Sequence, residues 1–370
     1  MNIDRLGSPW SANVFGVLSA VRASKLLDAE RYVGINATDV NMTKGRHLVS
    51  GVPPFGIGLE AVGEIVEVGE GVENLKVGQC VAYFNIRWNS YAEYTCIDAE
   101  WVFAIPEATP SYLGLIMSGL TATIGLDKAA RIMAGETVLI TAAAGGTGHI
   151  AVQWAKAADC HVIGTCSTEE KEKLLKDLGC DRVINYKKEN IAEVLAKEYP
   201  KGVNVVWETI GGQVFDDCLK NLSIRGRLVV VGGITGYKTE EKEALVKRDL
   251  SSVPEQLLYK SAAVMGFLVV AYNECFSSYF KFMSESVESG KLKILTDNGE
   301  KSTGSEFFDM EGIIRAVERY REDSSTFEIL YFVAKFVAKV RGPHVAAAYP
   351  CKTLFLTIRL TLLGSDFPCL

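Results

Sequence analysis

The 370-residue sequence has few residues that could form a metal site or a disulfide framework. Its four histidines have no cysteine or carboxylate nearby at a recognisable zinc spacing; they are His47, His149, His161 and His344. No two of its nine cysteines form a C-x-x-C pair, which argues against a zinc ribbon and a dense set of disulfides. We therefore predict no bound metal, structural roles for the histidines, and mostly reduced, buried thiols.

The sequence also lacks a long basic run and a long uncharged apolar segment. Subtracting 45 acidic from 39 basic side chains gives a net charge of −6, which makes nucleic acid an unexpected partner. The apolar runs that start at Phe327 and Thr353 are interrupted by charges and fall short of the ~20 residues that a membrane span needs. We interpret the end of the chain as a packed or non-native extension; a peripheral membrane helix is the alternative.

The length of the chain predicts two domains. Between residues 32 and 105, short Val- and Ile-rich runs broken by glycine are typical of an antiparallel, barrel-like domain. From about residue 111, apolar strands alternate with amphipathic helices, which predicts a doubly wound α/β domain with a parallel sheet. We expect four segments: the barrel-like domain at 1–105, the α/β domain at 106–266, a return segment at 267–325 that completes the first domain, and an atypical apolar tail at 326–370.

The glycine-rich segment AAAGGTG, from Ala142 to Gly148, lies between a predicted strand and a predicted helix. Small residues allow a sharp turn there, and the amides at the helix start can receive a pyrophosphate. An ordinary tight turn is the alternative. The position at the first strand-to-helix turn of the domain favours dinucleotide binding.

The end of the second predicted strand indicates which dinucleotide is used. An acidic residue there would bind the ribose hydroxyls of NADH, but this chain has Ser167, with Lys171 four residues later. A hydroxyl and an ammonium group suit a 2′-phosphate, so we predict NADPH. Lys171 could instead be a solvated helix residue, and Glu169 and Glu170 add negative charge nearby.

Several further motifs lie along the chain: YVGINATDVN, a G-x-E-x-x-G pattern at Gly58, Glu60 and Gly63, SGLTA, HVIGTCS, LGCDRVINY, GRLVVVGGITGY and MGFL. With AAAGGTG they make the chain similar, from Tyr32 to Val317, to the medium-chain dehydrogenase/reductase superfamily, in its quinone oxidoreductase branch. Relatives that use zinc have a cysteine where this chain has Asn36 and a histidine where it has Leu59. The resemblance therefore implies a zinc-free reductase with a GroES-like catalytic domain and a Rossmann domain.

The resemblance also implies a set of contacts for NADPH. The pyrophosphate turn corresponds to Gly145, Gly146, Thr147 and Gly148, and the group that receives the 2′-phosphate to Ser167, Lys171 and Tyr186. The adenosine and nicotinamide are expected to lie against Thr209, Val231, Tyr237, Phe267, Leu268 and Val269. Tyr237 and Phe267 could alternatively be core aromatic residues.

The implied reaction is conjugate reduction of α,β-unsaturated ketones, including 15-oxo-prostaglandins. Without zinc, the hydride chemistry needs another electron sink, which an enone provides through its carbonyl oxygen. Candidate donors to that oxygen are Asn36, Asn41 and Tyr237, although Asn36 or Asn41 could instead cap a turn. Two alternatives stay open: a quinone reductase with the same cofactor, and a catalytically impaired NADPH-binding variant.

The family further implies a homodimer formed through the nucleotide-binding domains. No compact apolar signal segment precedes residue 24, so an intracellular location, cytoplasmic or peroxisomal, is expected. Some relatives end in a peroxisomal Ser-Lys-Leu signal, whereas this chain ends in Pro368, Cys369 and Leu370. Residues 1–31 and those after about 320 depart from the family pattern.

Overall fold

The computed structural model describes residues 17–18, 25–43, 56–92, 94–237, 251–322, 331–335 and 351–352. The chain divides into two compact units. Unit 1 comprises Met1–Thr109, Asn298–Val317 and Val333–Leu370, and unit 2 comprises Pro110–Asp297 and Glu318–Phe332. Most of the atypical start and of the predicted tail 326–370 lies outside the described residues.

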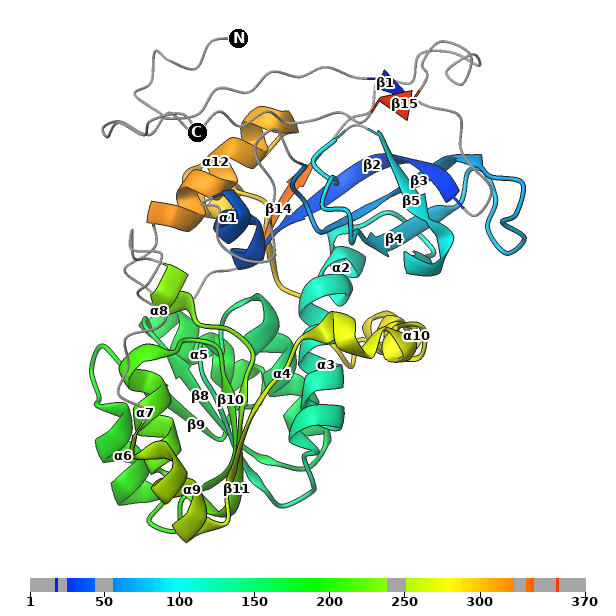
Figure 1. Cartoon of the computed structure of the whole chain (residues 1–370). Helices are drawn as coiled ribbons and strands as arrows, with labels where there is room; N and C mark the ends of the chain where they lie inside the picture. Colours follow the sequence, from blue (N-terminus) through cyan, green and yellow to red (C-terminus); the bar gives the residue numbers. More distant parts are fainter. Residues whose placement is uncertain are drawn as a thin grey trace, which may run out of the picture. The chain divides into compact units, whose positions relative to one another are not determined.

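The centre of unit 2 is a six-stranded parallel sheet (Figure 1). Its strands are β7 (Thr137–Ile140), β8 (His161–Cys166), β9 (Arg182–Asn185), β10 (Val203–Glu208), β11 (Leu222–Val230) and β12 (Ala263–Gly266). They lie in the order β12-β11-β10-β7-β8-β9, so the strand order reverses between β7 and β10. This sheet confirms the predicted doubly wound fold, and ligands of such sheets bind where the order reverses.

Helices cover both faces of the sheet, as the apolar faces of its strands require. One face carries α6 (Ile191–Glu198), α7 (Gly212–Lys220) and α9 (Val253–Lys260), and the other carries α3 (Leu120–Ile124), α4 (Gly146–Ala157) and α5 (Glu169–Asp177) (Figure 1). On the first face Leu139, Ile163 and Val206 of the strands form one core with side chains of α6 and α7. Burying such strands in a dry core is the main favourable contribution to folding.

Local sequence signals fix where two of these helices begin. Thr168 accepts a hydrogen bond from the Lys171 amide at the start of α5, and Asn190 accepts one from the Glu193 amide at the start of α6. A side chain of this kind satisfies an amide that has no partner within the helix. By contrast, no side chain caps the start of α4.

Unit 1 is built around an antiparallel sheet in which β2 pairs with β3 and β5, β3 with β4, and β4 with β6. The bounds are β2 (Lys25–Ile35), β3 (Glu60–Val68), β4 (Cys80–Phe84), β5 (Tyr94–Asp98) and β6 (Val102–Ala104). Two further pairs of strands are described: β13 (Thr296–Asp297) pairs in parallel with β14 (Tyr331–Lys335), and β1 (Val17–Leu18) pairs antiparallel with β15 (Cys351–Lys352). The remaining elements of this unit are short, apart from α1 (Ala37–Thr43) and α12 (Asp309–Glu322).

Unit 2 extends to Asp297, whereas the sequence predicted that its sheet domain ends at residue 266. The reason is that α10 (Phe276–Glu288), which follows the short η5 (Val269–Cys275), is tied to the start of the unit. Asp127 accepts hydrogen bonds from Trp154 Nε1 at 2.8 Å and from Tyr279 OH at 3.0 Å. Asp127 lies in the π-helical segment η4 (Gly125–Ala130), which follows η3 (Leu115–Gly119) and α2 (Pro110–Leu113). The predicted return segment is therefore split at Asp297.

The seven cysteines whose side chains are described are all free thiols, and Cys160, Cys166, Cys180 and Cys218 are buried. Burial raises the pKa of the Cys180 thiol to about 12 and that of the Cys218 thiol well above its usual value. These side chains behave as small apolar core groups. In the described part of the chain, no helix is long and apolar enough to cross a membrane.

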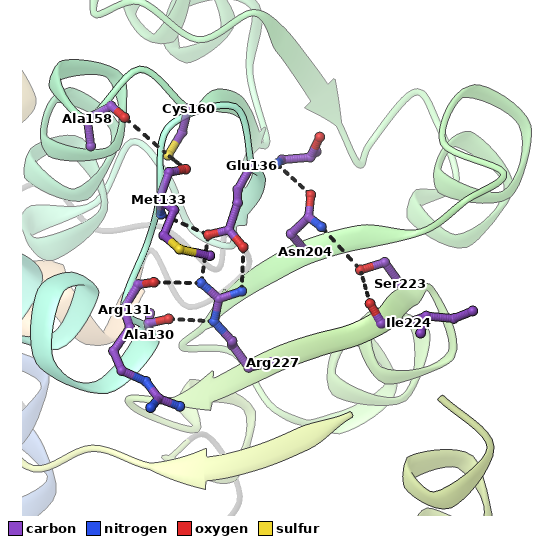
Figure 2. Close-up of polar contacts among 11 residues, drawn as sticks. Ala130, Arg131, Met133, Glu136, Ala158, Cys160, Asn204, Ser223, Ile224 and Arg227 are labelled. Carbon is purple, nitrogen blue, oxygen red and sulfur yellow. Dashed lines mark hydrogen bonds and ion pairs between the residues drawn. The ribbon is translucent and has the colours of Figure 1, made fainter. Parts of the chain in front are cut away.

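An ion pair holds the edge of the sheet at which the strands of unit 2 begin (Figure 2). Arg227 of β11 and Glu136, directly before β7, form two contacts of 2.6 Å, and both side chains are nearly buried. The guanidinium also donates to the carbonyls of Ala130 and Arg131 at the end of η4. A bidentate, nearly buried pair of this kind leaves an uncompensated charge when one partner is removed.

We therefore expect Arg227→Met to lower the free energy of unfolding by about 3 kcal/mol, measured by urea denaturation. The exposed pair between Lys176 and Glu172 provides the control, because Lys176→Met should cost less than about 0.5 kcal/mol. Equal losses in the two variants would contradict the structural role assigned to Arg227.

Candidate active site

The glycine-rich segment forms a sharp turn between β7 and α4. The Ala142 amide donates to the Thr165 hydroxyl and the Gly145 amide to the Ala142 carbonyl, and Ala142 itself has a positive φ of 47°. Gly148 permits the turn, since a Cβ there would lie 2.3 Å from the Ala142 oxygen. The chain can therefore enter the helix immediately after the strand.

The start of α4 offers amides to an anion. Its N-cap is Gly145, which has no side chain that could accept the first amides of the helix. The backbone N–H groups and the helix dipole favour a negative group at this position. The predicted pyrophosphate residues Gly145, Gly146, Thr147 and Gly148 therefore form a cradle that fits a dinucleotide.

A pair of threonines joins the strands at which the sheet order reverses. The Thr141 hydroxyl accepts from the Thr209 amide at 2.9 Å and donates to the Trp207 carbonyl, and the two hydroxyls lie 3.2 Å apart. One residue earlier, the buried Glu208 carboxylate accepts from the amides of Ile210 and Gly211, at 2.8 Å each. The loop that follows β10 is thus held in a fixed conformation beside the glycine-rich turn.

The ends of β8 and β9 bring together the residues predicted to receive a 2′-phosphate. Cys166 pairs with Asn185 in the parallel register, so Ser167 and Tyr186 follow adjacent strand ends. Ser167 is only 6% exposed, and its Oγ finds no hydrogen-bond partner among the described residues. Lys171 lies in the first turn of α5, directly after this end of β8. A buried hydroxyl without a partner is costly, and a phosphate oxygen would satisfy it.

One of the two acidic residues near this site, Glu169, forms an ion pair that partly neutralises its charge. Glu169 accepts from Lys188 Nζ at 2.6 Å, and this contact lowers the pKa of the Glu169 carboxyl. Because Lys188 follows β9 and Glu169 begins α5, the pair links the two strand ends. Glu169 thus does not oppose an additional phosphate as an isolated charge would.

The remaining predicted cofactor residues lie at the ends of β11 and β12. Val231 donates its amide to the Glu208 carbonyl, and Phe267 donates to the Val230 carbonyl. The Phe267 ring is buried against Trp207 and Tyr272, as the core interpretation predicted, whereas Leu268 is half exposed. A cofactor contact in this segment would therefore come from its backbone or from Leu268. Val269 is buried, and Tyr237 ends α8 (Ile234–Tyr237) with a side chain outside the described ones.

Unit 1 contains a buried polar cluster at the start of α1. Asn36 Nδ2 donates to Glu60 Oε1 at 2.7 Å, and the Asn36 amide donates to Asp39 Oδ2 at 2.8 Å. The second contact closes the helix start in the manner of a capping box. The Asn36 side chain thus binds Glu60, and the capping contact at this helix start comes from the Asp39 side chain.

Asp39 is fully buried, and burial raises the pKa of its carboxyl to about 7. Tyr91, whose hydroxyl donates to the Gly34 carbonyl at 3.2 Å, is buried beside it, and burial likewise raises the pKa of Tyr91. The cluster therefore holds a carboxyl that can carry a proton near neutral pH.

Asn41 stands apart from these contacts. It is 2% exposed, and neither Nδ2 nor Oδ1 finds a partner within the described residues. Asn41 caps no turn there, so its amide keeps both its donor and its acceptor capacity. The Asn36 amide, by contrast, already serves Glu60.

Sequence reasoning missed the roles of Asp39 and Glu208. Asp39 could have been found, because an acidic residue three positions after Asn36 has the spacing of a capping box. The bonds of Glu208 to its own loop leave no such signal. Among the described side chains, no three His, Cys, Asp or Glu residues gather at a metal site.

Comparisons with known proteins agree with this geometry. Residues 29–107 match the alcohol dehydrogenase GroES-like domain, and residues 146–285 match the zinc-binding dehydrogenase family. Prostaglandin reductase-3 of Bos taurus is 44% identical over 79% of this chain and 77% of its own. The chain belongs to the medium-chain dehydrogenase/reductase family.

Two further family members match most of the chain. A probable quinone oxidoreductase of Leishmania amazonensis is 40% identical over 72% of this chain and 78% of its own. The crystal structure of the quinone oxidoreductase of Escherichia coli with NADPH is 25% identical, with a TM-score of 0.74 over 87% of this chain and 94% of the other. Membership in this family confirms the predicted GroES-like and Rossmann architecture.

The buried Asp39 carboxyl generates a prediction about pH. A folded pKa of about 7, above the unfolded value of 3.8, means that the native state binds the proton more tightly. The contribution to stability is present below pH 4 and is lost as the pH rises through 7. Asp39→Asn should therefore gain up to about 4 kcal/mol over the wild type between pH 4 and pH 8.

Urea denaturation at a series of pH values measures this difference, with the exposed Asp177→Asn as the control. The control should follow the wild type at every pH. A constant difference between Asp39→Asn and the wild type would show that Asp39 does not titrate in this range.

Proposed function

We propose that this chain reduces the conjugated double bond of α,β-unsaturated ketones with NADPH, and that 15-oxo-prostaglandins are among its substrates. The observation that carries the cofactor assignment is the buried Ser167 hydroxyl next to Tyr186 and Lys171, which has no hydrogen-bond partner among the residues that the structure describes. The uncapped start of α4 supports it, because an NADPH molecule would place a pyrophosphate there. Structural similarity to an NADPH complex and sequence similarity to prostaglandin reductase-3 add support.

Bound NADPH supplies the hydride. The chain would contribute by binding and orientation: the turn from Gly145 to Gly148 holds the pyrophosphate, and Ser167 donates its hydroxyl to the 2′-phosphate. The loop that Glu208 holds after β10 fixes Thr209 in place.

Asn41 would stabilise the negative charge that develops on the substrate. Reduction at the β-carbon places negative charge on the carbonyl oxygen, and a fixed amide N–H stabilises such an oxyanion. The Asn41 amide suits this role because it is buried and has no competing partner within the described residues. The proton that the α-carbon then needs can come from water.

Quinone reduction is the second candidate, favoured by the similarity to quinone oxidoreductases. The test is NADPH oxidation at 340 nm by the full chain, with 15-oxo-prostaglandin E2 and a simple quinone offered separately and NADH as the control. Consumption of NADPH with a 13,14-dihydro product supports the enone reductase. Turnover of the quinone alone favours the second candidate, and binding of NADPH without turnover would mean an impaired variant.

Asn41→Leu is expected to lower kcat at least about tenfold with the enone and to leave the Kd for NADPH within about twofold, since the amide acts on the developing charge. Steady-state kinetics and fluorescence titration measure the two quantities. A matching loss of NADPH affinity would contradict the role given to Asn41.

Ser167→Glu should weaken NADPH binding at least about tenfold, because a carboxylate would repel the 2′-phosphate, while binding of NADH is retained. The same substitution at the exposed Ser277 of α10 is the matched control and should leave both affinities unchanged. Parallel losses for both cofactors would contradict the assignment of the 2′-phosphate to Ser167.

The proposal includes a homodimer and an intracellular location, as the family resemblance implies. β12 lies at the edge of the parallel sheet, so its outer backbone groups can pair with another strand. Light scattering of the full chain distinguishes a dimer from a monomer.

A further inference from the structure

His149, one turn into α4, makes two hydrogen bonds that fix its protonation state. Its Nδ1 lies 3.0 Å from the Gly145 carbonyl oxygen, and its Nε2 lies 3.1 Å from the Leu295 amide nitrogen. A backbone amide can only donate, so Nε2 accepts and Nδ1 carries the proton. The side chain is 2% exposed, and burial lowers the pKa of the imidazole to about 4, in keeping with a neutral ring.

The first of these bonds controls the direction of a peptide in the glycine-rich turn. The Gly145 carbonyl accepts from His149 twice, from the ring and from the backbone amide at 3.0 Å. In a trans peptide the C=O and the following N–H point in opposite directions. Holding the Gly145 carbonyl toward the helix therefore aims the Gly146 N–H out of its start, where the pyrophosphate would bind.

The second bond reaches residues 292–295. We call them the connector because the first segment of unit 2 ends two residues later, at Asp297. Gln153, one turn after His149, donates to the Lys293 carbonyl at 2.9 Å and accepts from the Lys293 amide at 2.8 Å. On the other side, Ile294 packs so tightly against Gly114 that a Cβ at Gly114 would lie 2.4 Å from it. The connector is thus bound to the helix that carries the pyrophosphate turn.

We propose that His149 is a positioning residue that couples cofactor binding on the glycine-rich turn to the connector. One rigid, neutral ring holds the Gly145 peptide with one nitrogen and the Leu295 amide with the other. An anion that draws on the Gly146 amide strengthens the first bond, and hydrogen bonds in a chain reinforce one another. Binding of NADPH therefore tightens the connector. This inference rests on the proposed binding of NADPH.

Two variants separate the two nitrogens. His149→Asn places an amide N–H near the position of Nδ1 and loses the acceptor for Leu295. His149→Gln places an amide oxygen near the position of Nε2 and loses the donor to Gly145. The Kd for NADPH is measured by fluorescence titration, exchange of the Leu295 amide by hydrogen exchange with and without NADPH, and folding by thermal unfolding.

In the wild type, saturating NADPH should slow exchange of the Leu295 amide about tenfold. His149→Gln should raise the Kd about tenfold, the effect of one lost hydrogen bond, whereas His149→Asn should stay within about threefold of the wild type. Both variants should lose the effect of NADPH on Leu295.

Gln153→Leu is the matched control, because it releases Lys293 from the same helix without touching the turn. It should speed exchange of the Lys293 amide while the Kd and the protection of Leu295 by NADPH stay as in the wild type. If the wild type binds NADPH but exchange at Leu295 does not change, the coupling is wrong. It is equally wrong if His149→Gln lowers thermal stability alone and keeps the Kd. If the wild type binds no NADPH, the proposed function fails instead.

Discussion

The close approach of α4 to the end of β7 is the constraint on which the nucleotide-binding unit depends. It is possible only because residue 148 has no side chain, since a Cβ there would overlap the Ala142 carbonyl. The approach creates the sharp turn at Gly145 and leaves the first amides of α4 without a capping side chain. It also places the ring of His149, the next residue, within hydrogen-bond distance of the Gly145 carbonyl in the turn. The sharp turn, the proposed binding of a pyrophosphate and the proposed coupling through His149 thus all depend on the absence of a Cβ at residue 148.

In each unit a buried carboxylate accepts hydrogen bonds from backbone amides and so fixes a segment of the main chain. Glu208 holds two amides of its own loop, and Asp39 holds the amide that precedes α1. Both residues are fully buried, and the hydrogen bonds that they accept from these amides compensate part of the free-energy cost of desolvating the carboxylate. Asp39 Oδ1 has no partner within the described residues, and burial raises the pKa of this carboxyl to about 7.

Much of this arrangement could be predicted from the sequence, because its signals are local. Alternating strands and helices from residue 137 onward indicate the parallel sheet, and the glycine spacing indicates the turn. The boundary at residue 266 could not be predicted well, because the end of unit 2 depends on Asp127 meeting Tyr279 across 152 residues. For the same reason the bond from His149 to Leu295 has no sequence signature. Such contacts between distant residues arise only from the packed fold.

The burial of the cysteines has a consequence for a protein that works on electrophiles. A conjugated enone is a Michael acceptor, and the protein nucleophile that attacks it most readily is a thiolate. Cys160, Cys180 and Cys218 are buried in unit 2, and burial raises the pKa of each thiol, so they stay protonated and out of reach. The core that stabilises the nucleotide-binding unit thereby also shields those sulfur atoms from alkylation by the compounds that the protein is proposed to reduce.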